Sequence, residues 1–316
     1  MNEESLIEVE DEKLYNTVEK WLIRKKWLEY AIKRQEKNKK DFVEFFTLTC
    51  SQIYDVRLFD DYNLILSKET SPTQKQYLSV TFCEKDKHRH SLIRDKLAGA
   101  KSHLCRFEDL VGAGRVGVSN KVNGWFPFDV LNLDLNEAPF KENSRIMLDV
   151  KCAIRKLFII QKLKNRSFSL FLTTCASEEG DDEKNKEDLH NRIDNNLKRN
   201  NEFKDLFFKK YPEGKFDNYH EFLLTAIPKL IIEHGFDEGF DIKCEEKFTY
   251  IGGNNITRMV SFIFDCEYRG SINSLVKIKP MRVSNIIERN FWNINEMLNQ
   301  DKSLLKEIEE LKEKYS

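Results

Sequence analysis

From about residue 42 onward, short apolar and β-branched runs alternate with stretches of helical periodicity, and this alternation restricts the possible folds more than any other feature. The runs predict strands and the stretches between them predict helices. Nearly continuous apolar strands separated by helices are typical of a parallel sheet covered on both faces, and right-handed connections make this a doubly wound, Rossmann-like α/β arrangement. The predicted strands are 42–49, 77–83, 101–107, 128–133 and 169–174, and the predicted helices are 51–66, 87–97 and 143–165.

The rest of the chain extends this α/β unit. Two apolar runs, 242–250 and 257–268, flank a Gly-Gly-Asn-Asn turn and predict an antiparallel hairpin at one edge of the sheet. A narrow apolar stripe near the end of the chain predicts packing against another helix, either of this chain or of a partner. The predicted organisation is a helical extension (1–41), an α/β domain (42–282) with a charged insertion at about 176–217, and a C-terminal helical tail (283–316).

Charge and cysteine usage limit the class of protein. The 52 basic and 53 acidic residues give no overall attraction to nucleic acid or membrane. Residues 19–40, however, contain nine Lys or Arg and three Glu, so this segment is either a solvated helix face or an arm that contacts phosphates or an acidic partner. The seven cysteines include no CxxC pair and predict buried thiols in a reducing compartment. Because neither a leader nor an apolar span is apparent, we expect a cytoplasmic protein without membrane contact.

Polar side chains follow three of the predicted strands where each strand ends. Glu84 and Asp86 follow 77–83, Glu108 and Asp109 follow 101–107, and Asn132 and Asp134 close 128–133. In an open α/β sheet, ligands bind outside the carboxyl ends of the strands, so these side chains are the candidate site residues. His88 and His90 stand two positions apart on a predicted helix and point to different faces, so no metal site is predicted.

The order of these strand ends resembles the class I S-adenosylmethionine-dependent methyltransferases. Within that family it is most similar to the enzymes that methylate guanine amino groups in transfer RNA, whose fourth strand closes in Asp-x-Asp-Pro-aromatic-Gly-x-Pro. The corresponding run here is Asn132-Leu133-Asp134-Leu135-Asn136-Glu137-Ala138-Pro139. Asp134 and Pro139 match that pattern, whereas Asn132 and Leu135 replace its first acid and its first proline. The resemblance covers roughly residues 42–175, and a weaker likeness connects the chain to methyltransferase-like proteins found beside bacterial anti-phage genes.

The resemblance implies how S-adenosylmethionine would be held. Glu84, with Asp86 close behind it, would accept hydrogen bonds from the hydroxyls of the cofactor ribose. Glu108 or Asp109 would accept a hydrogen bond from the adenine amino group. These expectations place the cofactor across the ends of the second and third predicted strands.

The resemblance also implies where the methyl group would be transferred. Asp134 with Asn132 would receive a substrate amino group beside the methyl donor, because methyl transfer needs an aligned nucleophile and a group that draws off positive charge. The loop after the first strand, which includes Thr49, would approach the methionine part of the cofactor.

The chain departs from the family pattern at the cofactor loop. Such loops use glycine so that the backbone can approach the ligand, but no glycine precedes Gly99, and side chains fill the segment 47–52. The run GAGRVG at 112–117 fits GxGxxG but opens no predicted helix, so we interpret it as a flexible loop.

These departures favour a methyltransferase-like protein with weakened or lost catalysis that acts in a nucleic-acid-related complex, with bacterial anti-phage defence as one setting. Two alternatives stay open. The first is an active N-methyltransferase that acts on a nucleic-acid base through Asp134 and Asn132. The second is a pure interaction scaffold that binds other protein subunits through its terminal helices.

Overall fold

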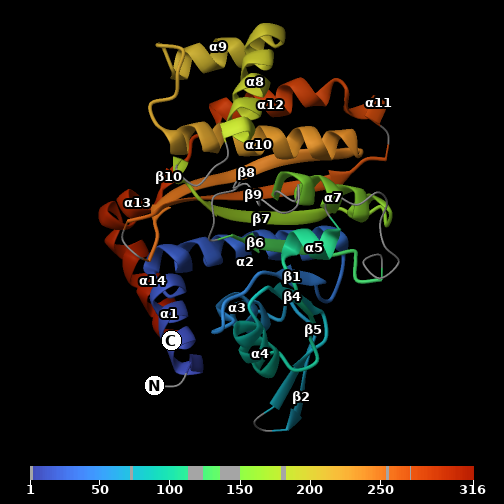
Figure 1. The fold of residues 1–316 in the computed structure, drawn as a ribbon, viewed down its shortest axis with the longest axis vertical. Helices are drawn as coiled ribbons and strands as arrows, with labels where there is room; N and C mark the ends of the chain where they lie inside the picture. Colours follow the sequence, from blue (N-terminus) through green and yellow to red (C-terminus); the bar gives the residue numbers. More distant parts are fainter. Residues whose placement is uncertain are drawn as a thin grey trace.

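The described strands form a main sheet of eight strands in the order β10-β8-β9-β7-β6-β1-β4-β5 (Figure 1). The structure, a computed structural model, describes residues 3–71, 74–112, 124–135, 150–178, 183–253, 256–270 and 272–316. The block β7-β6-β1-β4-β5 is parallel, and β9 is antiparallel to β7 and β8, so the expected Rossmann-like α/β fold with an antiparallel hairpin is confirmed. The strands are β1 (Phe45–Thr47), β4 (Val80–Glu84), β5 (Lys101–Leu104), β6 (Val130–Asp134), β7 (Phe168–Cys175), β8 (Phe240–Ile251), β9 (Arg258–Tyr268) and β10 (Trp292–Asn293).

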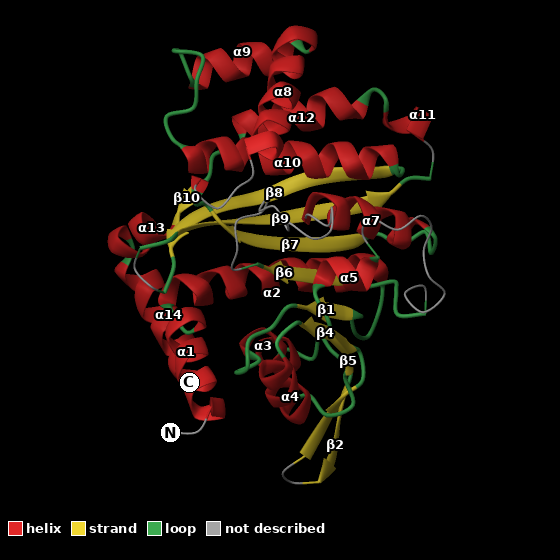
Figure 2. Cartoon of the chain, viewed as in Figure 1, coloured by secondary structure: helices red, strands yellow, loops and turns green. Residues whose placement is uncertain are grey.

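Helices cover both faces of this sheet (Figure 2). The first face packs against α5 (Phe107–Val111), α7 (Val150–Lys162), α10 (Tyr219–Asp237) and α12 (Ile278–Glu288). The charged insertion forms α8 (Glu183–Arg199) and α9 (Asn201–Lys210), which lie on α10 and α12, and α11 (Ile272–Leu275) precedes α12. The second face packs against α2 (Val18–Asn38), α3 (Tyr54–Asp61), α4 (Lys87–Lys96), α13 (Ile294–Gln300) and α14 (Lys302–Tyr315), and α1 (Glu3–Tyr15) precedes α2.

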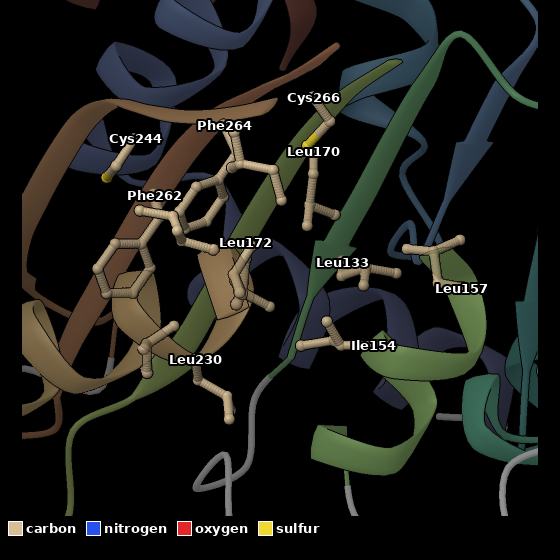
Figure 3. Close-up of a cluster of buried hydrophobic side chains, with 14 of the residues drawn as sticks. Leu133, Ile154, Leu157, Leu170, Leu172, Leu230, Cys244, Phe262, Phe264 and Cys266 are labelled. Atoms are coloured by element: carbon tan, nitrogen blue, oxygen red, sulfur yellow. The ribbon is translucent and has the colours of Figure 1, made fainter. Parts of the chain in front are cut away.

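Strand alternation divides the apolar side chains between two cores. Leu133, Leu170 and Leu172 point to the first face and pack with α7 and α10, as Figure 3 shows. Phe45 and Phe171 point to the second face, where Trp27 of α2 stacks on Phe171 at 5.8 Å between ring centroids. Successive side chains of a strand face opposite sides of the sheet. The same alternation therefore decides which polar side chains of the strands lie on the second face.

The connections of the sheet define a switch point beside β1. The chain passes from β1 to β4 and β5 on one side and then returns to β6 and β7 on the other side. Ligands of open α/β sheets bind where the connections diverge in this way, outside the carboxyl ends of the strands. The candidate site is therefore the edge formed by the ends of β1, β4 and β6.

Two sequence predictions need correction, and one element of the structure was not predicted. The strand predicted at 101–107 ends at Leu104, and Glu108 and Asp109 lie in the first turn of α5 instead of closing a strand. A second sheet, the hairpin β2 (Ser67–Ser71) and β3 (Gln74–Tyr77), was not predicted, because its exposed polar side chains carry no apolar alternation. The tail is not entirely helical, since β10 pairs with β8.

The terminal helices pack on the chain itself. Helix α2 lies along β7 and β9, so the predicted extension is a layer of the fold. The predicted apolar stripe belongs to α14, which packs on α2, and Tyr315 stacks on Trp21 at 5.1 Å. Asn16 Nδ2 donates to Ser316 Oγ at 2.8 Å, so the end of α1 and the end of the chain lie side by side (Figure 1). The stripe consists of Leu304, Leu305, Ile308 and Leu311.

A buried lysine under α12 makes the stability of the fold depend on pH. Lys247 is 2% exposed, its Nζ donates to the Ile286 carbonyl at 2.7 Å, and burial lowers its pKa to about 7. Between that value and the ordinary lysine value the unfolded chain binds more protons, so stability rises with pH. We expect the free energy of unfolding to increase by about 2 kcal/mol from pH 7 to pH 9 because of this residue. Urea unfolding at both pH values measures it, and the same increase in Lys247→Met would contradict the assignment.

Candidate functional site at the carboxyl edge of the sheet

The ends of β1, β4 and β6 place four predicted or neighbouring polar residues at one edge of the sheet. Thr47 of β1 is aligned with Asn132 of β6, and Asp134 lies two residues further along β6. By strand alternation these three side chains share the face of Phe45, on the side of α2 and α3. Glu84 closes β4 at the same edge.

Asp134, the predicted receiver of a substrate amino group, forms an ion pair with Lys20 of α2. Both carboxylate oxygens lie 2.6 Å from Lys20 Nζ, and the two side chains are 6% and 4% exposed. Burial lowers the pKa of Lys20, although the attraction of Asp134 opposes this shift. The carboxylate is therefore neutralised by an amino group of the chain itself.

Asn132 and Thr49, also predicted site residues, turn toward Asp55. Asn132 Nδ2 donates to Asp55 at 3.1 Å and Thr49 Oγ1 donates at 2.5 Å, while Thr47 Oγ1 donates to the same carboxylate. Asp55 is 4% exposed and lies in the first turn of α3. The one sequence signal for Asp55 is that it is an acid at the start of the helix after the first strand, but an acid at that position usually interacts with the helix terminus. Asn132 Oδ1 is buried and has no hydrogen-bond partner within the described ranges.

Helix α1 packs against the loop after β1, which was predicted to approach the cofactor. Asp11 is 1% exposed and accepts a hydrogen bond from Ser51 N at 2.8 Å, in the loop between β1 and α3. Arg89 of α4 lies 3.1 Å from the same carboxylate, and Tyr54 donates to Glu12. The Ser51 N–H and the Arg89 guanidinium, which could bind an external anion, therefore bind the Asp11 carboxylate of α1.

The predicted ribose ligands have local roles at the end of β4. Glu84 accepts a hydrogen bond from Asp86 N at 2.7 Å, and burial raises the pKa of Glu84. Asp86 is the N-cap of α4 and accepts a hydrogen bond from Arg89 N at 2.8 Å. Both acids therefore make contacts at the end of β4 and the start of α4, whereas Asp134 pairs with Lys20.

The remaining sequence features divide between described and undescribed residues. Asn136, Glu137 and Pro139 lie outside the described residues, as does the GAGRVG run after Gly112. Gly112 ends α5 with φ +66°, a left-handed conformation that favours glycine. The described part of the chain contains no group of three His, Cys, Asp or Glu side chains arranged to hold a metal ion.

A cavity of about 140 Å³ lies at the opposite edge of the sheet, near the start of β7. Its lining combines acids and bases, and includes Arg34, Lys37 and Asp265. None of the predicted site residues contributes to it. Its lining residues are Tyr30, Lys33, Arg34, Lys37, Ser169, Glu245 and Asp265.

Sheet topology and the polar switch point define a Rossmann-like α/β protein. The profile of the PP_RS20740-like family matches residues 18–274, and the chain belongs to this family. The matched span begins with α2 and includes Lys20, Asp55, Asn132 and Asp134, whereas α1 precedes it. No curated protein matches the chain. Over the described ranges, no helix has both the length and the apolar character that crossing a membrane requires.

Helix α1 lies close to the turn after β8, and a substitution in this turn tests whether the turn stabilises the position of the helix. A Cβ on Gly253 would lie 2.4 Å from the Lys13 carbonyl oxygen and 2.9 Å from Leu14 Cα, so both clashes are with backbone. Because overpacking costs about 1–3 kcal/mol, we expect Gly253→Ala to raise amide hydrogen exchange in residues 3–15 by about tenfold.

Gly235→Ala is the matched control for that experiment. Its Cβ would lie 2.0 Å from Ile242 Cδ1 in the core, far from α1 in the fold. Gly235→Ala should lower the free energy of unfolding of the whole protein. Amide hydrogen exchange should then be faster than in wild type by the same factor in α1 as in the rest of the chain. Exchange in α1 that is the same in Gly253→Ala and wild type would show that the turn does not hold the helix.

Proposed function

We propose that this protein is a divergent S-adenosylmethionine-dependent methyltransferase-like protein with weakened or lost catalysis, acting in a nucleic-acid-related complex. The supporting observation is that the polar groups of the switch point are already bound by the chain itself. Lys20 neutralises Asp134, and Asp11 takes the Ser51 N–H in the loop after β1. With these side chains in place, the residues present do not fit S-adenosylmethionine at the position that the resemblance implies.

The same contacts argue against an active N-methyltransferase in this conformation. A substrate amino group would have to displace Lys20 from a carboxylate that is 6% exposed. Asn132 would also have to give up its hydrogen bond to Asp55. Breaking a buried ion pair leaves an uncompensated charge and costs about 3–5 kcal/mol, so substrate binding would be weakened by that amount.

Calorimetric titration of the full chain with S-adenosylmethionine and with its demethylated product tests the proposal. We expect no micromolar binding of either compound, and no transfer of a labelled methyl group to RNA or DNA. Circular dichroism and the unfolding transition of the same sample confirm that the protein is folded. Micromolar binding together with methyl transfer would establish the active alternative instead.

Contact with nucleic acid through residues 19–40 stays a prediction. The ion pairs of this segment limit the number of Lys and Arg side chains that are available to contact phosphates. Lys20, Arg34, Lys37 and Lys40 form ion pairs within the chain. Lys25 and Lys26 are paired with Glu307 and Glu29. Along this fully described segment, the exposed cations without a carboxylate partner are Lys33 and Lys39.

Salt dependence separates α2 from other surfaces as the source of nucleic-acid binding. Two phosphate contacts predict that the logarithm of the binding constant falls with the logarithm of salt concentration at a slope of about −2. Fluorescence anisotropy with labelled RNA and DNA measures this slope. A steeper slope that persists in the Lys33→Ala/Lys39→Ala variant would assign the contact to another surface.

A further inference from the structure

The ammonium group of Lys20 lies among three aromatic rings as well as beside Asp134. Its Nζ is 5.9 Å from the ring centroid of Tyr15, 5.9 Å from that of Trp27 and 5.8 Å from that of Tyr250. Rings within about 6 Å of a cation attract it through their negative faces, more strongly when water is excluded. The four groups come from α1, α2, β8 and β6, which meet at the carboxyl edge of the sheet. We name Tyr15, Trp27, Tyr250 and Asp134 the cation cage.

The cation cage differs from an ordinary buried lysine environment in this protein. Lys247 is equally buried, but its Nζ donates to a backbone carbonyl. Lys20, in contrast, has a bidentate carboxylate contact in addition to the rings. A carboxylate together with aromatic faces is the arrangement that recognises methylated ammonium groups.

Tyr250 supplies a second observation that indicates a ligand. Its side chain is 1% exposed, and its hydroxyl has no hydrogen-bond partner among the described residues. An unpaired buried hydroxyl destabilises a fold, and phenylalanine would provide the same ring without that penalty. A hydroxyl at this place can bind a polar group of a molecule larger than the lysine side chain.

We propose that the cation cage is a binding site for a small methylated ammonium or sulfonium cation, and that Lys20 is the internal ligand that occupies it. An external cation and Lys20 then compete for Asp134. Lys20 lies in the first turn of α2, where its backbone N–H donates to Thr17 Oγ1 at 3.3 Å, so this helix cap does not depend on the position of the lysine side chain. The extension of this site to the sulfonium of S-adenosylmethionine rests on the proposed function, whereas the cage itself rests on the contacts of Lys20.

The experiment removes the internal ligand and supplies an external one. Lys20→Ala keeps the carboxylate and the rings but opens the space of the lysine side chain. Thermal unfolding is measured in tetramethylammonium chloride, in trimethylsulfonium chloride and in sodium chloride at equal ionic strength. At about ten times the dissociation constant, we expect either methylated cation to raise the unfolding temperature of Lys20→Ala by about 3 °C relative to sodium.

Two controls make the effect specific. Wild type retains its own ammonium and should show no difference between the salts. Lys20→Ala/Asp134→Ala lacks the carboxylate and should likewise show none. A folded Lys20→Ala variant without a cation-specific shift, or an equal shift in the double variant, would overturn the proposal.

If Lys20→Ala does not fold in sodium chloride, refolding yield becomes the readout. Recovery in tetramethylammonium but not in sodium supports the site, and failure in both salts overturns it. A separate arm compares S-adenosylmethionine with its neutral demethylated product on the same variant. The small cations could stabilise the variant while S-adenosylmethionine stabilises it no more than its neutral product does. That result would support the cation cage as a binding site and contradict its connection with the proposed function.

Discussion

Lys20→Met is expected to lower the free energy of unfolding by about 3–5 kcal/mol, because it leaves Asp134 buried without its counter-charge. Methionine fills most of the space of the lysine side chain, so the loss comes from the ion pair more than from a cavity. Urea unfolding at pH 7 measures the change. A loss below about 1 kcal/mol would show that water reaches Asp134 and that the pair is not buried in solution.

Two further variants separate the ion pair from other effects. Lys25→Met removes a cation from the same helix whose partner, Glu307, is 57% exposed, and it should cost about 0–1 kcal/mol. Lys20→Met/Asp134→Leu replaces both charges by apolar groups and should recover most of the stability that Lys20→Met loses, since apolar replacement of a buried pair is often neutral. Failure of that recovery would mean that Lys20 stabilises the fold through contacts other than Asp134.

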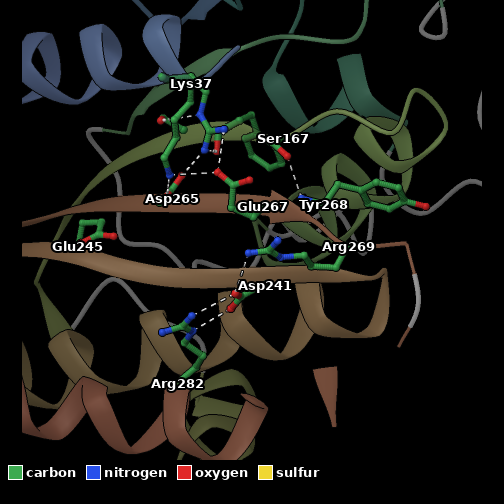
Figure 4. Close-up of polar contacts among 12 residues, drawn as sticks. Lys37, Ser167, Asp241, Glu245, Asp265, Glu267, Tyr268, Arg269 and Arg282 are labelled. Carbon is green, nitrogen blue, oxygen red and sulfur yellow. Dashed lines mark hydrogen bonds and ion pairs between the residues drawn. The ribbon is translucent and has the colours of Figure 1, made fainter. Parts of the chain in front are cut away.

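The second large loss of stability is expected at the edge of the sheet opposite to Lys20 and Asp134. Arg34 is 1% exposed, pairs with Asp265, lies 3.1 Å from Glu267 and donates to the Phe168 carbonyl at 3.3 Å. Figure 4 shows Lys37 beside the same two carboxylates. We expect Arg34→Met to lower the free energy of unfolding by about 3–5 kcal/mol in urea.

Lys37→Met is the control, because its side chain is 51% exposed and it shares both carboxylates with Arg34. It should cost about 0–1 kcal/mol. Equal losses in the two variants would contradict the difference in burial.

The same cluster predicts a response to acid. Although burial alone would raise the pKa of Glu267, Arg34 and Lys37 hold it below its usual value. Its contribution to stability is therefore present above the unfolded value, near 4.3, and is lost as pH falls through the lower folded value. In Arg34→Met, the free energy of unfolding should therefore fall less between pH 6 and pH 3 than in wild type, because the ionised form of Glu267 has lost a stabilising partner.

Much of the fold could be predicted because each element carries its own pattern. The apolar run at 169–174 lies within β7, and the hairpin around the Gly-Gly turn is β8 and β9. The hairpin β2–β3 could not be predicted, because exposed strands have no buried face to impose alternation. The end of β5 was misplaced because the apolar Phe107, which was assigned to the end of the predicted strand, is the first residue of α5.

The candidate site was predicted less completely than the fold. Strand ends place Asp134 and Asn132 at the switch point, and these positions follow from the sequence pattern. Their partners do not, because Lys20 is 114 positions from Asp134 and pairing across that separation depends on the packing of α2. The basic charge of residues 19–40 suggested a solvated helix face or an arm that contacts phosphates or an acidic partner, whereas several of those cations form buried contacts within the chain.

The packing of α2 also has a consequence for how the protein acquires its fold. Trp27 packs against Phe171, and Arg34 pairs with Asp265, which lies 231 positions further along the chain. During synthesis, α2 therefore gains these partners only after β7 and β9 have been made. We expect a high contact order, slow folding and a nascent chain that needs chaperones to shield the apolar side of α2 until then.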